Sequence, residues 1–548
     1  MTTAPQRNLL KSYAKRVRDA RRAHAGVTEP GLAPEFQQFL VEILPQLPAA
    51  PELTVLAEFI NAGIGRPDIA LKRAGEQARA FVELKAMDKP TDGSRWTTPH
   101  DRRQFARFSE FSVWATCNFH EIRLYERAES KGNAALVPEE ALDPSQSDTA
   151  ADKLIDAHDA SAALRLIERL AQSDPPSASD AEHLAELLAH SARLVRGIIR
   201  DRLAELTVEG KTDTPLHQVR QEFRDVLYSH PEVAGYSSSD FDELFSAAFA
   251  QTLAFGLLLV REATGGALVD NHAYEQMPDE HPLMRTTLRV LSLPEVAQEV
   301  GAGFEVMLQT VNGFDPKILE IRKDGSDPIL YFYENFLSTF DPAAREKYGV
   351  YYTPTEVVRF MVGALDRALR DHLKTDGIAD SKVHILDPAT GTGTFLLGIA
   401  DRLRRNVTET HGPGQAPAAL RGLAERMYGF ELLIGPYAVA HYRLHHTLSR
   451  KPDGTTDKTL KLPRLGVYLT DTLARPGTAA ALGSLGFVSE GIRDERALSD
   501  RVKSQQEILA IIGNPPYRRL EAGENETLGG VDTYRSHKAI AARVTTAR

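Results

Sequence analysis

The stretch KVHILDPATGTGTFLLGIADRL, Lys382–Leu403, decides the fold of the C-terminal part of the chain. It predicts a short apolar strand over residues 383–386, a turn that contains Gly391 and Gly393, and a helix that begins near Thr394. The two glycines let the backbone approach a ligand closely, because no side chain stands in the way. The stretch therefore predicts a ligand-binding turn at the end of a strand in a parallel α/β sheet.

The residues around the two glycines indicate the kind of ligand. A dinucleotide-binding fingerprint requires a third glycine where this sequence has Leu396. Asp387 at the end of the strand suits a positively charged ligand better than a pyrophosphate. S-adenosylmethionine fits these residues, because it carries an ammonium and a sulfonium group and no phosphate.

Three more strands are expected along the chain. They are RMYGFELL (426–433), LGVYLTDTL (465–473) and ILAIIG (508–513). Glu431 ends the first of these and can accept both ribose hydroxyls of the cofactor, and Asp471 ends the second and is placed to meet its adenine amino group. Because the carboxyl ends of parallel strands share one crevice, we expect both acids in the same site. Each acid taken singly can instead be a helix cap.

The last of these strands runs into an Asn-Pro-Pro-Tyr sequence, and a Tyr-Thr-Pro sequence stands earlier in the chain, at 352–354. In this order the motifs resemble the γ class of amino-methyltransferases that act on DNA adenine, with continuous coverage from about Asp341 to Tyr517. The resemblance implies S-adenosyl-L-methionine as cofactor and double-stranded DNA as partner. The residues that it assigns to cofactor binding are Tyr352, Thr353, Pro354, Asp387, Gly391, Gly393, Phe395, Glu431 and Asp471.

The same resemblance assigns methyl transfer to Asn514, Pro515, Pro516 and Tyr517. The exocyclic amine of adenine is a poor nucleophile, because its lone pair is delocalised into the ring. If the Asn514 side-chain oxygen and the Pro515 carbonyl both accept its N–H bonds, the nitrogen pyramidalises and the lone pair is released. The two prolines hold these acceptors at little entropic cost. Tyr517 is the expected stacking platform for an adenine flipped out of the duplex.

A second set of charged residues lies near the N-terminus, in GRPDIALKRAGEQARAFVELKA, residues 65–86. The pattern predicts two short strands, with Asp68 at the head of the first and Glu83 and Lys85 on one face of the second. Two carboxylates at one edge suit Mg²⁺, and a lysine beside them can orient or deprotonate the attacking water. The alternative is a surface hairpin with an ion pair.

This spacing resembles the PD-(D/E)xK nuclease superfamily, with Asp68, Glu83 and Lys85 in its motif positions. The resemblance implies a magnesium-dependent endonuclease in which Asp68 and Glu83 hold the metal. Glu29, ahead of a predicted helix, resembles the acidic first-helix position that many members use as a further ligand. Gln104 is expected on a helix that follows the strands.

Composition is that of a cytoplasmic protein without a membrane span. The 548 residues carry a net charge of −10 and one cysteine, which excludes an internal disulfide. The longest apolar run, Leu253–Val260, is shorter than the roughly twenty residues that cross a bilayer, and predicts a buried helix. Basic residues are frequent in Met1–Ala25, either as a solvated helix face or as an arm that contacts phosphates.

The chain is expected to be α/β and to contain several domains. We predict a nuclease-like domain with a basic N-terminal arm at 1–136, a linker at 137–182 and a helical connector at 183–340. A partial, Rossmann-like methyltransferase core follows at 341–528 and a polar, disordered tail at 529–548. The whole order resembles the type IIG restriction-modification enzymes, in which one target-recognition domain directs both activities.

That family continues after its Asn-Pro-Pro-Tyr motif with further strands and the recognition domain, whereas this chain continues with a short polar sequence. The expectation is therefore a C-terminally truncated chain, with recognition supplied by a second polypeptide. Two alternatives remain open. One is a fragment that binds DNA or cofactor without catalysis, and the other is a methyltransferase whose nuclease domain is a remnant.

Overall fold

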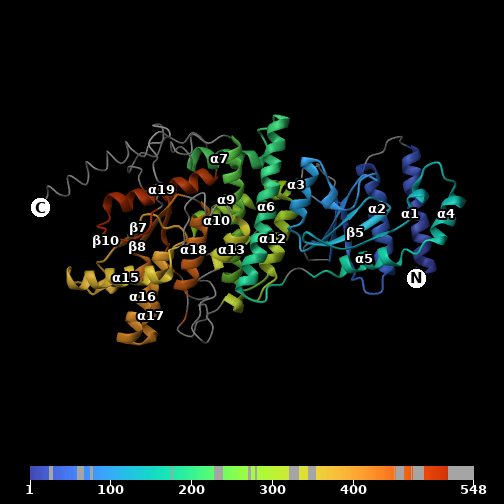
Figure 1. Ribbon diagram of the computed structural model, residues 1–548. Helices are drawn as coiled ribbons and strands as arrows, with labels where there is room; N and C mark the ends of the chain where they lie inside the picture. Colours follow the sequence, from blue (N-terminus) through green and yellow to red (C-terminus); the bar gives the residue numbers. More distant parts are fainter. Residues whose placement is uncertain are drawn as a thin grey trace. The chain divides into compact units, whose positions relative to one another are not determined.

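The computed structural model describes residues 1–23, 29–57, 67–73, 78–174, 177–227, 238–268, 273–277, 281–319, 332–342, 353–432, 434–449, 451, 462–470, 472 and 487–515. The chain forms two compact units (Figure 1). Unit 1 comprises Met1–Ala178, His190–Glu205 and Val300–Phe314, and unit 2 comprises Ser179–Ala189, Leu206–Glu299 and Asp315–Arg548. The segment 183–340, predicted as one connector, is helical but divides between the two units.

Unit 1 is built on a six-stranded sheet with the order β1-β2-β3-β4-β5-β6. β3 and β4 are parallel, and every other pair of neighbours is antiparallel. The strands are β1 (Thr54–Ala57), β2 (Ile69–Lys72), β3 (Ala78–Leu84), β4 (Val113–Cys117), β5 (Glu121–Glu126) and β6 (Glu129–Ala135).

Apolar cores lie on both faces of this sheet, because successive side chains of a strand point to opposite faces. Val82 and Leu84 of β3 belong to one core, and Phe81 belongs to a second core with Phe108 and Trp114. The helices of unit 1 are α1 (Ala4–Ala23), α2 (Glu29–Ile43), α3 (Pro99–Phe108), α4 (Asp148–Ala157), α5 (Ser161–Gln172), part of α6 (Ala181–Glu209) and α12 (Ala302–Asn312).

The stretch predicted as a linker, residues 137–182, contains α4 and α5 and packs into unit 1. Ile155, Leu164, Ile167 and Leu170 are all buried in the same core as Val82. Ala151 and Ile155 are four residues apart in α4, and Leu164, Ile167 and Leu170 are three apart in α5, so each helix has an apolar stripe. The stretch predicted as a linker is therefore a pair of amphipathic helices that belong to unit 1.

The basic N-terminal segment forms α1, which is part of the unit 1 core. Arg18 is fully buried, pairs with Asp148 at 2.8 Å and donates to the Ala141 carbonyl at 2.7 Å. Lys15 pairs with the same Asp148 at 3.1 Å, and Arg16 pairs with Glu35 and Glu42. These ion pairs favour a structural role for the basic residues over an arm that contacts phosphates.

Unit 2 contains the parallel sheet that the sequence predicts. Its order is β10-β7-β8-β9 and all three pairings are parallel. The strands are β7 (Ile385–Asp387), β8 (Met427–Glu431), β9 (Gly466–Leu469) and β10 (Ala510–Ile511). Each strand falls within or next to one of the predicted segments. Because all the pairings are parallel, the carboxyl ends of the strands share one edge of the sheet.

Helices of unit 2 pack around this sheet, and in Figure 1 its strands lie between α19 and α16. One helix precedes the first strand of the sheet, α15 (Thr355–Asp371). Four lie between its strands in the chain: α16 (Thr394–His411), α17 (Ala416–Ala424), α18 (Ile434–Leu448) and α19 (Phe487–Gln505). Earlier helices are α7 (Pro215–Leu227), α9 (Ser238–Thr264), α10 (Pro282–Leu291), α11 (Pro294–Val300), divided at its end between the units, and α13 (Phe332–Phe340).

Among the residues that the structure describes, one helix, α9, is long and apolar enough to cross a membrane. Its most apolar window has a mean hydropathy of 1.7, and 78% of that window is buried inside the protein. Leu253–Val260 is buried throughout, as the sequence predicts. Such burial is that of a core helix.

Candidate functional site

Asp387, the last residue of β7, lies at the carboxyl edge of the parallel sheet and is fully buried. Burial raises its pKa to about 7, and the nearby Glu431 adds to the rise. Its Oδ1 accepts a hydrogen bond from the Ala389 N–H at 3.1 Å. Its Oδ2 accepts none from the described residues. A buried carboxylate oxygen of this kind suits a cationic or hydrogen-bond-donating group of a ligand.

The glycine turn after β7 brings backbone and carboxylate together. Gly391 has a φ of 54° and Gly393 a φ of 83°, both in the left-handed region that favours glycine. The Gly391 N–H donates to Glu431 Oε2, at the end of β8, at 2.9 Å. A Cβ at Gly391 would meet nothing within 4 Å. The predicted residues Gly391 and Glu431 are thus joined at the sheet edge, next to an open position beside Gly391.

The Asn-Pro-Pro-Tyr segment begins at the same edge. Gly513 packs so closely against β7 that a Cβ there would lie 2.5 Å from Asp387 Oδ1. The next residue, Asn514, donates a hydrogen bond from Nδ2 to Thr353 Oγ1 at 3.2 Å. Residues 161 positions apart in sequence, from the two motifs predicted to flank the cofactor, therefore meet beside Asp387.

Four of the predicted site residues, Tyr352, Asp471, Pro516 and Tyr517, lie outside the described residues. The neighbour of Asp471, Thr472, donates from its hydroxyl to the Pro388 carbonyl, which brings the end of β9 toward the turn after β7. Pro515 is exposed and Pro354 precedes the first turn of α15.

Phe395 points into the protein. It is 3% exposed on the first turn of α16, within the apolar core. Sequence reasoning missed Arg443 of α18, whose Nη1 donates to both the carbonyl and the hydroxyl of Thr392 at 3.0 Å. These bonds hold the glycine turn between its two glycines. No local pattern marks Arg443, because its partner lies 51 residues away in the sequence.

The donor set at this edge fits S-adenosylmethionine. A buried oxygen of the Asp387 carboxylate has no described donor, the space beside Gly391 is open, and Glu431 stands at the next strand end. A carboxylate that burial has forced toward neutrality gains most from a cationic partner. The residues that would hold the cofactor are therefore present.

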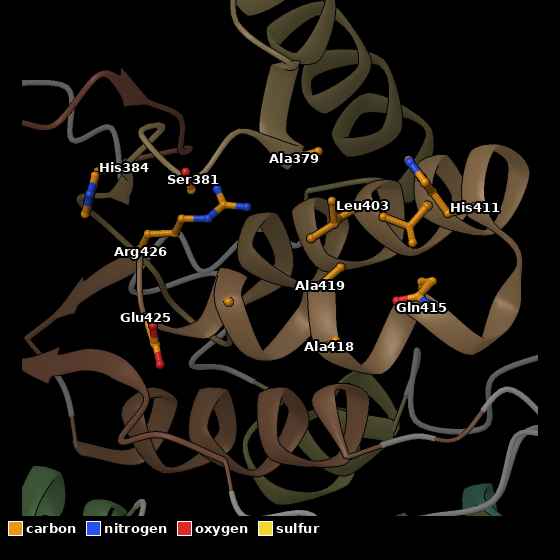
Figure 2. Close-up of a pocket in the computed structure, with 12 residues that line it drawn as sticks. Ala379, Ser381, His384, Leu403, His411, Gln415, Ala418, Ala419, Glu425 and Arg426 are labelled. Carbon is orange, nitrogen blue, oxygen red and sulfur yellow. The ribbon is translucent and has the colours of Figure 1, made fainter.

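The open cavity drawn in Figure 2 lies at the opposite edge of the same sheet. It has a volume of about 720 Å³ and opens between α16 and α17, with Leu403 and Ala419 in its lining. His384 and Arg426, which immediately precede β7 and β8, mark it as the amino edge of the sheet. Ligands of open parallel sheets bind at the carboxyl edge, so this cavity is separate from the Asp387 site.

A second cluster of charged residues lies in unit 1, where the sequence predicts it. Lys85 Nζ contacts Glu83 Oε1 at 2.8 Å and Gln104 Oε1 at 2.6 Å, and Gln104 Nε2 donates to Glu83 Oε1. Asp68 Oδ2 accepts from the Leu84 N–H at 2.6 Å. The structure thus brings together Asp68, Glu83, Lys85 and Gln104. The side chain of Glu29 lies outside the described part of the chain.

This cluster is buried rather than on the surface of a hairpin. Glu83 is 3% exposed and Lys85 4% exposed. The indole ring of Trp96 lies 4.6 Å from Lys85 Nζ, in a cation–π contact. Burial raises the pKa of Asp68, against the hydrogen bond from Leu84 and the charge of Lys85. The alternative of a surface hairpin is therefore wrong, because α3 and Trp96 cover Glu83 and Lys85.

The donor set of the cluster fits a hard divalent cation. Asp68 and Glu83 supply two carboxylates, and Mg²⁺ is commonly held by one or two carboxylates together with waters and phosphate oxygens. Within the described ranges there is no group of three or more His, Cys, Asp or Glu side chains that could hold a metal.

Comparison with known proteins identifies the segment around the Asp387 site. Residues 326–538 match the model of the family described as N-6 DNA Methylase. A curated relative, the adenine-specific methyltransferase PglX of Streptomyces coelicolor, is 28% identical over 190 residues. The match covers 32% of this chain and 15% of PglX. Residues 326–538 thus resemble the N-6 DNA methylases, and the match to the curated relative spans about one seventh of that protein's length.

Solved structures with weak overall similarity include a DrdV–DNA complex and the DNA-bound type ISP restriction-modification enzyme LlaBIII. Both have a TM-score of 0.44 and 21% identity. The DrdV match covers 97% of this chain and 46% of that one, and the LlaBIII match covers 69% and 23%. The type IIG restriction endonuclease BpuSI has a TM-score of 0.25 at 12% identity, over 81% of this chain and 42% of that one. At these scores the similarities carry no argument about activity.

Proposed function

We propose that unit 2 carries an S-adenosyl-L-methionine-dependent DNA methyltransferase site that acts on the exocyclic amine of a flipped adenine. The observation that carries this proposal is the meeting of Asn514 and Thr353 beside Asp387, at the carboxyl edge of the parallel sheet. The match of residues 326–538 to the N-6 DNA methylase family supports it.

Three groups at this edge would hold the cofactor. The buried Asp387 carboxylate would accept from a donor group of the cofactor, and Glu431 would accept from its ribose hydroxyls. The backbone at Gly391 would allow close approach. Thr353 at the start of α15 would line the same crevice, together with Tyr352 and Asp471 from outside the described ranges.

Asn514 would act on the target amine. Its Oδ1 and the Pro515 carbonyl would accept the two N–H bonds of adenine N6, which turns the nitrogen lone pair out of conjugation. When bound, the cofactor would supply an electrophilic methyl group with a thioether as leaving group, and the amine would lose one proton to solvent. Holding the acceptors in place before reaction is proximity and electrostatic catalysis.

A second candidate function belongs to unit 1. The approach of Asp68, Glu83, Lys85 and Gln104 favours a magnesium-dependent endonuclease of the PD-(D/E)xK kind. The two carboxylates would hold Mg²⁺, and Lys85 would orient the attacking water. Together the two sites would make a restriction-modification protein of the type IIG kind, which works on double-stranded DNA in the cytoplasm. We propose that another region or a second polypeptide supplies the target recognition.

Incubation of the 548-residue chain with unmethylated plasmid DNA and tritiated S-adenosylmethionine tests the methyltransferase. We expect label in DNA with the wild type and none with Asn514→Ala, which keeps the cofactor residues. Absence of label with plasmid and with genomic DNA would reject the activity of this chain. It would favour the alternative of a fragment that binds DNA or cofactor without catalysis.

Plasmid cleavage with Mg²⁺ tests the nuclease. We expect linear or nicked product with the wild type and none with Lys85→Ala. Lys131→Ala is the control, since Lys131 pairs with the acids Glu126 and Glu129 on β5 and β6, away from the cluster. Equal cleavage by wild type and Lys85→Ala would contradict the assignment. No cleavage by the wild type would leave unit 1 as a structural remnant.

A further inference from the structure

Thr353 and Asn514 form a contact that links two motifs through their side chains. Nδ2 of Asn514 lies 3.2 Å from Oγ1 of Thr353, and both residues are partly buried. Asn514 follows β10 and Thr353 precedes α15, so the contact joins two elements that are distant in sequence.

The direction of this hydrogen bond decides which end of the Asn514 amide faces the substrate. An asparagine side chain has one acceptor oxygen and one donor NH₂ group on the same carbon. A hydroxyl can accept from the NH₂ group or donate to the oxygen. When Thr353 accepts from Nδ2, the oxygen of Asn514 is turned away from Thr353 and remains available as an acceptor.

We propose that Thr353 is a positioning residue for the methyl transfer, which holds the Asn514 amide with its oxygen toward the adenine amine. This inference rests on the proposed function and adds a role to Thr353 beyond contact with the cofactor. If the amide turned over, its NH₂ group would face the N–H bonds of the amine, donor against donor, and the amine would keep its lone pair in conjugation.

The backbone at Asn514 is fixed separately from its side chain. Ile512 N–H donates to the Leu386 carbonyl at 3.0 Å, and Gly513 lies against Asp387. These contacts with β7 set where Asn514 stands but leave rotation about its side-chain bonds. Of the described residues, Thr353 makes the side-chain contact that selects the amide orientation.

Substitutions at Thr353 separate orientation from cofactor binding. Thr353→Val removes the hydroxyl and keeps the β-branched shape, Thr353→Ser keeps the hydroxyl, and Thr410→Val makes the same chemical change on an exposed face of α16. Three quantities are measured: the dissociation constant of S-adenosylmethionine, the KM for DNA, and the single-turnover methylation rate at saturating cofactor and DNA.

We expect the single-turnover rate of Thr353→Val to fall about ten- to a hundredfold, as for a misplaced reacting group, with both binding constants within about threefold of wild type. Thr353→Ser and Thr410→Val should keep nearly the wild-type rate. An unchanged saturating rate in Thr353→Val, or a loss confined to cofactor affinity, overturns the positioning role while the proposed function stands. A wild type that methylates no DNA overturns both.

Discussion

At the scale of single residues, burial of the Asp387 carboxyl makes the stability of the protein depend on pH. Its folded-state pKa, about 7, lies above the value near 3.8 of an exposed aspartate. A group with a raised pKa contributes its full stability below the lower value and loses it as pH rises through the higher one. The cofactor-free protein therefore loses stability between about pH 4 and pH 7 through this residue.

Asp387→Asn should remove that loss. The amide oxygen of the variant side chain can still accept from the Ala389 N–H. Because the amide does not ionise, the variant should gain stability relative to the wild type as pH rises, by roughly 4 kcal/mol at most. Thermal melts from pH 4 to pH 8 measure it. The same variant should lose most of its affinity for S-adenosylmethionine by calorimetry. A pH-independent stability difference would contradict the account.

Gly513 tests the close approach of β10 to β7. In Gly513→Ala the new methyl would stand 2.5 Å from Asp387 Oδ1 and 3.2 Å from Pro388 Cδ, so strand or turn must shift. We expect a loss of about 1–3 kcal/mol in the free energy of unfolding and a lower methylation rate. Gly363→Ala in α15 is the control, because its Cβ meets nothing within 4 Å. Equal stability of the two variants would refute the packing argument.

At the scale of elements, α1 is held in the core by a buried cation. Arg18 and Lys15 pair with the same Asp148, but Arg18 is fully buried and Lys15 is 57% exposed. Arg18→Ala should cost about 2 kcal/mol, because it also strips the Ala141 carbonyl of its donor, whereas Lys15→Ala should cost under about 0.5 kcal/mol. Chemical denaturation measures both. Similar losses in the free energy of unfolding would show that burial does not determine how much these ion pairs stabilise the protein.

The sequence predicts those parts of the fold and site that depend on local pattern. Asp387 and Glu431 could be found because each ends an apolar strand, and β7 and β8 place both at one edge. The contact between Thr353 and Asn514 could not be found in this way, and neither could the contact between Arg443 and Thr392. In both contacts the two residues lie far apart in the sequence. Residues 137–182 were predicted as a linker because their composition outweighed the apolar spacing of α4 and α5, which pack into the core of unit 1.

Burial of the Glu83 and Lys85 cluster was also beyond the reach of the sequence. Period two places Glu83 and Lys85 on one face of the strand, and Phe81, two residues before Glu83, lies in the second core. This face is covered by α3 and by Trp96, both of which come after β3 in the chain. Spacing within a strand gives no information about such tertiary covering.

At the scale of the whole molecule, the two candidate sites stand in different compact units with separate residues. Asn514→Ala should therefore abolish methylation and leave magnesium-dependent cleavage intact, and Lys85→Ala should do the reverse. Each variant is assayed for both activities on the same DNA. Loss of both activities from either substitution would show that the sites are not independent.

The central claim concerns the atom that is methylated. DNA without prior methylation is incubated with the chain and with S-adenosylmethionine bearing a deuterated methyl group, then digested to nucleosides and analysed by mass spectrometry. The account predicts N6-methyladenine carrying a fully deuterated methyl group, absent with Asn514→Ala. Deuterated methyl on cytosine, or on no nucleoside, would contradict it.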